Sequence, residues 1–150
     1  MKILIVDDDP NMQELVDYNL RLDGHEVSIA SSAAEGLTSA REQAPDLILL
    51  DVMMPGMDGL EALPILKRDP KTSQIPVFML TARGRMGDVE RAFAVGADDY
   101  ITKPFDPAKL SQMVAVKLGR KASRRPRPAA NRSGPGIGTG LGGAQKTDRG

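Results

Sequence analysis

The chain of 150 residues contains no cysteine, which excludes a disulfide framework and any metal site built from thiolates. No apolar run approaches the ~18 residues that a membrane-spanning helix needs. The aliphatic residues after Met1 and Lys2 are too few for the core of a signal peptide. The single histidine, His25, follows Gly24 in a predicted turn and is interpreted as a surface residue. These absences predict a soluble, cytoplasmic protein.

Acidic and basic residues balance over the whole chain, with 20 of each sign, but they are unevenly distributed. Residues 1–120 hold 13 Lys/Arg against 19 Asp/Glu, a balance of −6, whereas residues 121–150 hold 7 against one Asp, a balance of +6. The second segment is rich in glycine, proline and arginine, and such a composition buries too little apolar surface to offset the entropy of ordering. We therefore predict one domain at 1–120 and a disordered basic tail at 121–150.

Five short apolar runs alternate with five segments of helical periodicity in the first 120 residues. Strands are predicted at 3–6, 26–30, 46–50, 76–80 and 99–101, and helices at 10–22, 34–41, 59–68, 87–95 and 107–119. The first, third and fourth runs are almost continuously aliphatic, which is typical of strands covered on both faces. Alternating strands and helices predict a parallel sheet with helices on both sides. The expected fold is α/β, a flavodoxin-like, doubly wound five-stranded sheet of order 2-1-3-4-5 in three layers.

Polar residues stand where these strands end. They are Asp7, Asp8 and Asp9 after the first strand, Asp51 after the third, Thr81 after the fourth, and Lys103 after the fifth. In the order 2-1-3-4-5 the first and third strands are neighbours, so their aspartates should converge. Carboxylates that lie this close repel one another unless a cation intervenes, and Mg²⁺ prefers one or two carboxylates together with a phosphate. With a lysine nearby, the pattern predicts a Mg²⁺-dependent site for a phosphoryl group.

Each of these residues also has a purely structural interpretation. Asp9 before Pro10 is typical of a helix N-cap, and Asp58 before Gly59 is another. Asp51, taken alone, could simply begin a turn, and Lys103 before a proline could be a solvated loop charge. The joint placement at the ends of different strands is what favours a single site.

Four stretches resemble the receiver domain of bacterial response regulators, of the kind found in chemotaxis regulators: residues 3–10, 45–59, 80–82 and 96–105. The intervals of 43, 30 and 22 residues from Asp8 to Asp51, Thr81 and Lys103 also fit that family. The resemblance covers essentially residues 1–119. It implies a phosphorylation-activated receiver of a two-component phosphorelay, a signalling switch that catalyses only its own phosphorylation and dephosphorylation.

The resemblance also implies a role for individual residues. Asp51 would accept a phosphoryl group from a sensor histidine kinase, a phosphotransfer protein or a small phosphodonor. Asp7, Asp8, Asp51 and the backbone carbonyl of Met53 would hold Mg²⁺. Thr81 and Lys103 would bind phosphoryl oxygens, and the Lys103–Pro104 bond is expected to be cis.

Activation in this family is expected to pass from Thr81 to Tyr100, which turns inward when the threonine moves toward the phosphate. The switching surface would then be the face formed by the fourth helix, the fifth strand and the fifth helix, where a downstream protein binds. Phosphorylation acts by adding about −1.5 to −2 charges. We expect a monomer or a weak, phosphorylation-dependent dimer and no membrane partner. The arginines of the tail offer an electrostatic contact with nucleic acid, but a solvated tail is the favoured interpretation.

The chain departs from the family pattern at several positions. Met53 and Arg83 lie two residues after Asp51 and Thr81, where the family's side chains tune attack of water on the phosphoryl group. Since methionine cannot orient a water, we expect slow dephosphorylation. Pro64 predicts a kink or a late start in the third helix. Met113 stands where dimerising receivers commonly carry an arginine, which weakens the case for a dimer.

Other interpretations remain. The chain could be a receiver module cut from a longer, for example DNA-binding, response regulator, with the tail as a linker. An aspartyl-phosphate phosphatase of the haloacid-dehalogenase kind would need an aspartate at the position of Met53, and a flavodoxin would need a Ser/Thr-rich loop after the first strand. Both are disfavoured.

Overall fold

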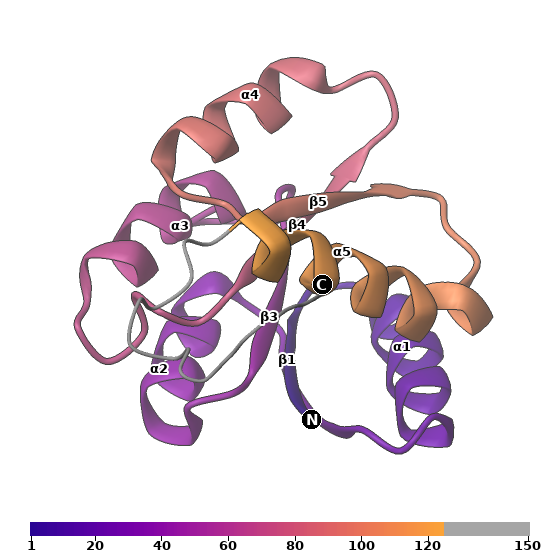
Figure 1. Cartoon of the computed structure of the whole chain (residues 1–150). Helices are drawn as coiled ribbons and strands as arrows, with labels where there is room; N and C mark the ends of the chain where they lie inside the picture. Colours follow the sequence, from indigo (N-terminus) through magenta and orange to yellow (C-terminus); the bar gives the residue numbers. More distant parts are fainter. Residues whose placement is uncertain (125–150) are drawn as a thin grey trace, which may run out of the picture. The chain divides into compact units, whose positions relative to one another are not determined.

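The structure is a computed structural model that describes the backbone of residues 1–124 and the side chains of residues 1–120 (Figure 1). The chain divides into two units, Met1–Val114 and a second unit that begins at Ala115. The first unit contains the whole sheet and every residue of the predicted site.

Five strands and five helices alternate, as the sequence predicts. The strands are β1 (Lys2–Val6), β2 (Glu26–Ala30), β3 (Leu47–Asp51), β4 (Val77–Ala82) and β5 (Asp99–Lys103). The helices are α1 (Pro10–Leu22), α2 (Ala33–Gln43), α3 (Gly59–Arg68), α4 (Met86–Val95), a single 3₁₀ turn η1 (Pro107–Lys109) and α5 (Leu110–Arg124). The sheet has the order β2-β1-β3-β4-β5 and all neighbouring strands are parallel. The predicted fold class is confirmed.

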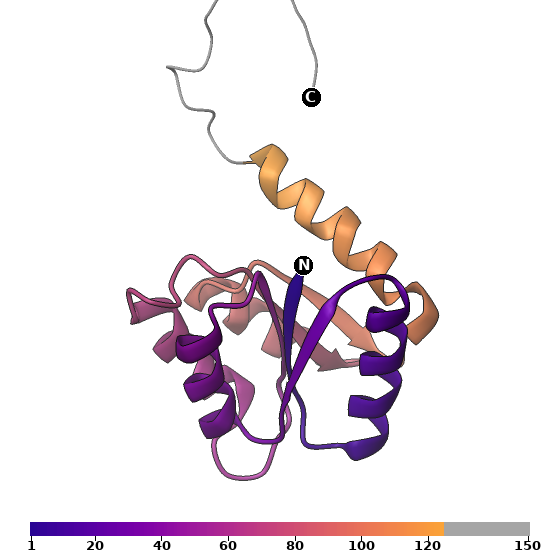
Figure 2. The same cartoon turned by 90° about the horizontal axis from the view of Figure 1, so that it is seen from below.

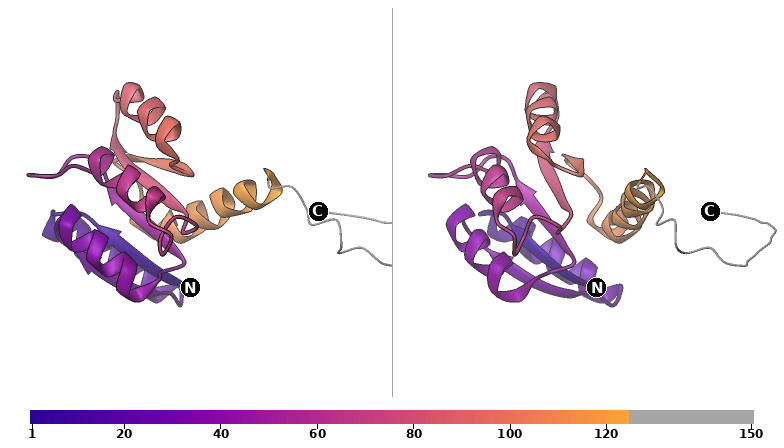
Figure 3. Two further views of the ribbon diagram at one scale, coloured as in Figure 1. Left: turned by 90° about the vertical axis from the view of Figure 1, so that its left-hand side faces the viewer. Right: turned by 60° about the vertical axis from the view of Figure 1, so that its left-hand side comes forward.

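Helices cover both faces of the sheet. Helices α2, α3 and α4 lie side by side over one face (Figure 3), and α1 lies on the opposite face (Figure 2). Covering on both sides explains the continuous aliphatic runs, because every residue of β3 and the first five of β4 are buried. Strands of this kind alternate between two cores instead of between core and solvent.

Side-chain caps fix where three of the helices begin. Asp9 accepts from the N–H of Asn11, and Ser32 accepts from that of Glu35. Asp58 and Glu61 form a reciprocal capping box at the start of α3, which satisfies two of the backbone donors that a helix start leaves unpaired. Helix α3 begins at Gly59, where the predicted range 59–68 places it, and runs through Pro64. Of the two effects expected of that proline, a kink or a late start, the late start does not occur.

The boundary predicted at residue 120 falls inside α5, whose backbone continues to Arg124. Residues 125–150, which make up most of the predicted disordered tail, lie outside the described residues. In the part of the chain that the structure describes, no helix has both the length and the apolar character to cross a membrane.

The loop between β3 and α3 passes directly beneath the end of β3. The N–H of Gly59 donates to the carbonyl of Val52 at 2.9 Å, and a Cβ atom at position 59 would collide with the carbonyl oxygen of Asp51. Only glycine permits this approach, because any side chain would push the start of α3 away from Asp51.

We expect Gly59→Ala to lower the free energy of unfolding by about 2 kcal/mol, because the added methyl group meets fixed backbone. Gly87→Ala is the matched control, since Gly87 lies in α4 with nothing within 4 Å of its missing Cβ. That variant should gain about 0.5–1 kcal/mol through helix propensity. Urea denaturation measures both, and equal stability of the two variants would contradict the close contact.

Candidate functional site

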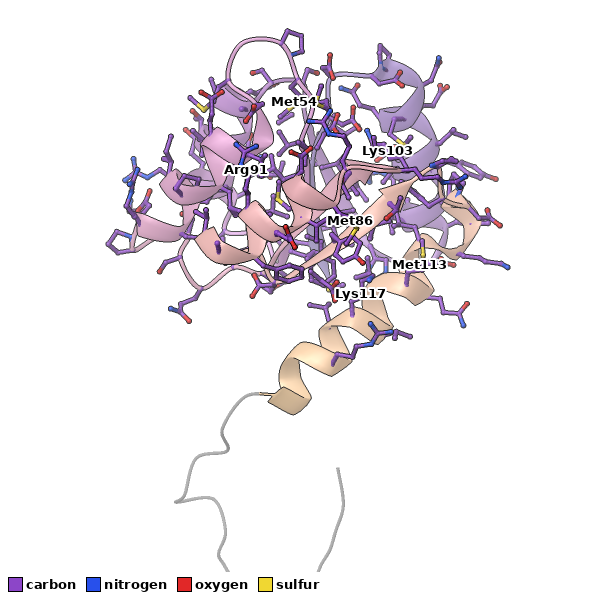
Figure 4. The ribbon with its side chains drawn as sticks, turned by 90° about the horizontal axis from the view of Figure 1, so that it is seen from above. Met54, Met86, Arg91, Lys103, Met113 and Lys117 are labelled. Atoms are coloured by element: carbon purple, nitrogen blue, oxygen red, sulfur yellow. The ribbon has the colours of Figure 1, made fainter. Side chains whose placement is uncertain are left out.

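The sheet brings the predicted residues together at the carboxyl ends of its strands. Val6 pairs with Leu50, so Asp7, the residue after β1, lies beside Asp51, the last residue of β3. On the next strand of the sheet, Thr81 of β4 pairs with Thr102 of β5. Lys103 follows at the end of β5 (Figure 4). Parallel strands end at one edge, so four separate segments of sequence contribute to one site.

Lys103 joins the two buried aspartates. Its Nζ atom lies 3.1 Å from Oδ2 of Asp7 and 3.1 Å from Oδ1 of Asp51. Asp7 is fully buried and Asp51 is 5% exposed. The other oxygen of Asp7 accepts from the N–H of Asp9 at 2.9 Å, and Oδ1 of Asp51 accepts from the N–H of Met53 at 3.3 Å. The lysine thus serves two carboxylates that burial would otherwise disfavour as ions.

The protonation of Asp51 is shifted by this environment. Burial, and then the negative charge of Asp7, raise the pKa of Asp51 from 3.8 to about 6, although Lys103 opposes the shift. Burial acts to lower the pKa of Lys103, but the charges of Asp51 and Asp7 outweigh it and raise that pKa above its usual value. The lysine therefore stays cationic, while the nucleophile candidate ionises only near neutral pH.

Asp7, Asp8 and Asp51 form a carboxylate cluster able to hold a cation. Each offers one oxygen, and these oxygens all lie within 4.8 Å of one another. Asp8 is exposed, so the cluster opens to solvent on its side. Three carboxylates against one lysine leave an excess of negative charge, and the donors are the hard oxygens that Mg²⁺ prefers. The donor set fits the predicted ion. Asp9 acts as the N-cap of α1, in agreement with its structural interpretation.

The remaining predicted residues lie on β4, on β5 and in the loops after β3 and β4. Thr81 is buried, and its hydroxyl donates a long bond of 3.4 Å to the carbonyl of Ala82. Tyr100 is half-buried and packs edge-to-face on Phe93 of α4, with ring centroids 6.1 Å apart. Met53 is 56% exposed, and Arg83 in the β4–α4 loop is also exposed. Their functional roles stay predictions.

The sequence did not predict the role of Gln13. Its Nε2 atom donates to the carbonyl of Asp7 at 2.6 Å and to Oγ of Ser31 at 3.0 Å. One amide therefore ties the loop after β1 to the loop after β2 and fixes the backbone that carries the aspartates. No local sequence signal identifies a glutamine on an amphipathic helix as such a support, because its two partners, Asp7 and Ser31, lie in two different loops.

Comparison with known protein families matches residues 3–115 to the response regulator receiver domain. The chain belongs to this family. The receiver is thus the signal-accepting domain of two-component response regulators, as its motifs indicate.

The receiver resembles both longer and equally short proteins. It is 44% identical over 128 residues to the DNA-binding dual master transcriptional regulator RpaA of Synechocystis sp., covering 85% of this chain and 53% of that one. It is 41% identical over 119 residues to the DNA-binding response regulator MtrA of Mycobacterium tuberculosis, covering 79% and 51%. The chain therefore spans about half the length of these curated relatives.

Solved structures give the same family. A putative response regulator from Chloroflexus aurantiacus superposes with a TM-score of 0.73 at 38% identity, covering 79% of this chain and 98% of that one. The chemotaxis protein CheY4 of Vibrio cholerae superposes with a TM-score of 0.73 at 32% identity, covering 78% and 98%. Unlike the curated relatives, these two chains are matched over nearly their whole length.

The shifted pKa of Asp51 predicts a pH-dependent stability in the absence of metal. Folding raises this pKa from 3.8 to about 6, so the native state binds the proton more tightly than the unfolded chain does. The resulting stabilisation is complete below the unfolded value and is lost as the pH rises through about 6.

The loss for wild type relative to Asp51→Asn, measured by urea denaturation in EDTA from pH 4 to pH 8, should be on the order of 2–3 kcal/mol. Taking the difference between the two proteins cancels the titration of the other carboxylates. A difference that does not change with pH would show that Asp51 is not perturbed.

Proposed function

We propose that the receiver is a phosphorylation-activated switch in which Asp51 accepts the phosphoryl group. The observation that supports this most directly is the arrangement around that carboxylate, with Lys103 at 3.1 Å and two further aspartates in reach of one cation. Phosphoryl transfer needs an in-line oxygen nucleophile and fixed positive charge around the moving group, and little else. The site supplies the nucleophile and one of the charges from its own residues.

The reaction follows from these positions. A carboxylate oxygen of Asp51 forms a bond to phosphorus while the bond from phosphorus to the donor breaks, and the donor, a histidine nitrogen or an acyl oxygen, leaves with its electron pair. Lys103 exchanges its contact with Asp51 for one with a phosphoryl oxygen. Mg²⁺ held by Asp7, Asp8, Asp51 and the Met53 carbonyl would supply the remaining positive charge. Above pH 6 Asp51 is largely ionised and therefore competent to attack.

The phosphoryl group is sensed through Thr81 and Tyr100. The hydroxyl of Thr81 makes only a 3.4 Å bond at rest, so turning toward a phosphoryl oxygen costs it little. Tyr100 contacts Phe93, which couples any movement of β5 to α4. Phosphate biases an existing equilibrium between the two arrangements by binding one of them more strongly.

The output surface is the face of α4, β5 and the first residues of α5, up to Val114. Met86, Phe93 and Val95 of α4 are partly exposed apolar side chains, which offer a downstream protein apolar surface to cover. The phosphoryl donor is a sensor histidine kinase or a phosphotransfer protein, and the receiver catalyses no reaction on a separate substrate. A cytoplasmic location is consistent with these partners.

A second candidate is that the chain is the receiver half of a longer regulator that binds DNA. The half-length coverage of RpaA and MtrA favours it. In that case the same switch would act on an attached DNA-binding domain, and contact with nucleic acid would come from that domain.

Incubation with Mg²⁺ and acetyl phosphate should add one phosphoryl group to the wild type and none to Asp51→Asn. Intact-mass measurement detects the adduct, and EDTA should abolish it because Lys103 is then the one positive charge of the site against three carboxylates and the incoming phosphoryl group. An adduct of equal yield in the Asp51→Asn protein would place the acceptor elsewhere.

The lifetime of the adduct should depend on Met53. We expect Met53→Asn to lose phosphate about three to ten times faster, because an amide can hydrogen-bond the attacking water and a thioether cannot, at the strength of one ordinary hydrogen bond. The decay of the phosphorylated proteins after removal of donor measures this. Decay that is equal or slower in the variant would remove Met53 from the hydrolysis step.

A further inference from the structure

The two ends of α4 are held by different kinds of contact. At the C-terminal end, Gly96 ends the helix with φ 115°, and the aliphatic stem of Lys67 packs against it. Nζ of Lys67 donates to the carbonyl of Ile75 at 2.9 Å and pairs with Asp98 at 3.1 Å. Asp98 also accepts from the N–H of Val77 at 2.8 Å. This end is thereby fixed to α3, to the start of β4 and to the loop before β5.

The N-terminal end of α4 lacks such an anchor. The N-cap residue of α4 is Arg85, and its side chain makes no capping hydrogen bond, unlike those at the starts of α1, α2 and α3. Its first turn instead contains Asp88, whose carboxylate is buried at 5% exposure. Nε of Arg85 lies 2.9 Å from one oxygen of Asp88, and Nη1 of Arg91 lies 3.6 Å from the other. These three side chains are here named the α4 clasp.

The clasp compensates the buried charge poorly. Among the buried side-chain polar atoms of residues 1–120, Oδ2 of Asp88 is the one that accepts no hydrogen bond, so its contact with Arg85 is an ion pair without hydrogen-bond geometry. The arginine side chains are 47% and 69% exposed and keep much of their hydration. A buried carboxylate with such partners is costly, and an outward movement of the first turn would return it to water.

The clasp is also connected to the site. Arg85 follows Thr81 by four residues, and its N–H donates to the carbonyl of Ala82 at 3.3 Å. Ala82 in turn pairs with Lys103 across β4 and β5. Met86 marks this end of α4 and Arg91 lies further along the helix in Figure 4. Of the three residues of the clasp, Arg85 is thus the one nearest to Thr81 along the chain, and its backbone is bonded to the residue after Thr81.

We propose that the α4 clasp is a latch that holds the first turn of α4 in its resting position and opens on phosphorylation, with α4 pivoting on its Lys67–Asp98 end. Asp88 and Arg85 are positioning residues in this account, since neither touches the phosphoryl group. The inference rests on the proposed function, because it needs Thr81 to respond to the phosphoryl group.

The latch predicts opposite effects for two substitutions in the full chain. Arg85→Ala leaves the carboxylate buried and unpaired, which destabilises the resting position and favours the open one. Asp88→Leu replaces the buried charge with an apolar group of similar size, which favours the resting position. A ligand that binds the open state binds more tightly when that state is more populated.

The measurement is the apparent dissociation constant for beryllofluoride, a phosphoryl mimic, by calorimetric titration in Mg²⁺ and fluoride. We expect Arg85→Ala to bind about fivefold more tightly than wild type and Asp88→Leu about fivefold more weakly. Arg91→Ala, which removes the longer pair, should shift the constant in the direction of Arg85→Ala but by less. If Arg85→Ala does not fold, Arg85→Gln tests the same contact.

Two outcomes overturn the latch alone: affinities within twofold of wild type, or shifts of both variants in the same direction, as a purely structural role would give. Failure of the wild type itself to bind beryllofluoride overturns the proposed function and the latch with it. The wild-type titration therefore separates the two failures.

Discussion

A single ammonium group between two buried carboxylates is the constraint on which this site depends. Asp7 and Asp51 lie side by side because β1 and β3 are neighbours, and neither can be buried as an ion without compensation. Lys103 supplies that compensation from β5, two strands away from β3 in the sheet. The position of β5 therefore affects the pKa of Asp51. In turn, a change in the charge of Asp51 changes the ion pair at the end of β5. The charge of Lys103 thus links the ionisation of Asp51 to the position of β5.

The helices around the sheet support this arrangement in unequal ways. Helices α1, α2 and α3 start at side-chain caps, and the loop before α3 is pressed against the backbone of Asp51. These contacts fix the starts of α1, α2 and α3. Helix α4 starts without a cap, over a buried carboxylate served by two exposed arginines. Among the helices α1 to α4, the one that forms part of the proposed output face is thus also the one that starts without a side-chain cap.

Much of this could be predicted from the sequence. Continuous aliphatic runs and helical periodicity predicted the strands and the helices, since both are properties of the local sequence. The order of the sheet was taken from the flavodoxin-like, doubly wound fold that such an alternation favours. The convergence of Asp7, Asp8, Asp51 and Lys103 followed from that order, because parallel strands end at one edge. Strand ends are also where the predictions were least accurate: β5 runs two residues beyond its expected end and includes Lys103 itself.

The rest depends on tertiary contacts that leave no local signal. Gln13 joins the carbonyl of Asp7 to Ser31, a residue 18 positions away from the glutamine, and Asp88 resembles an ordinary acidic residue of a helix's first turn until its burial is known. Pro64 shows the opposite case, where a local rule predicted a disturbed helix start and the capping box of Asp58 and Glu61 prevailed. Burial and non-local hydrogen bonds decide the cases of Gln13 and Asp88, and two local capping hydrogen bonds decide the start of α3.

The segment from Asp51 to the start of α3 contains one residue with no room for a side chain and one whose side chain is exposed. Gly59 is enclosed by backbone and admits no side chain, whereas the side chain of Met53 is exposed and its backbone N–H donates to Asp51. A change of side chain at 53 is therefore expected to have little effect on the stability of the fold. On the role proposed for Met53, the lifetime of the phosphoryl group changes with this one exposed side chain while the stability of the domain does not.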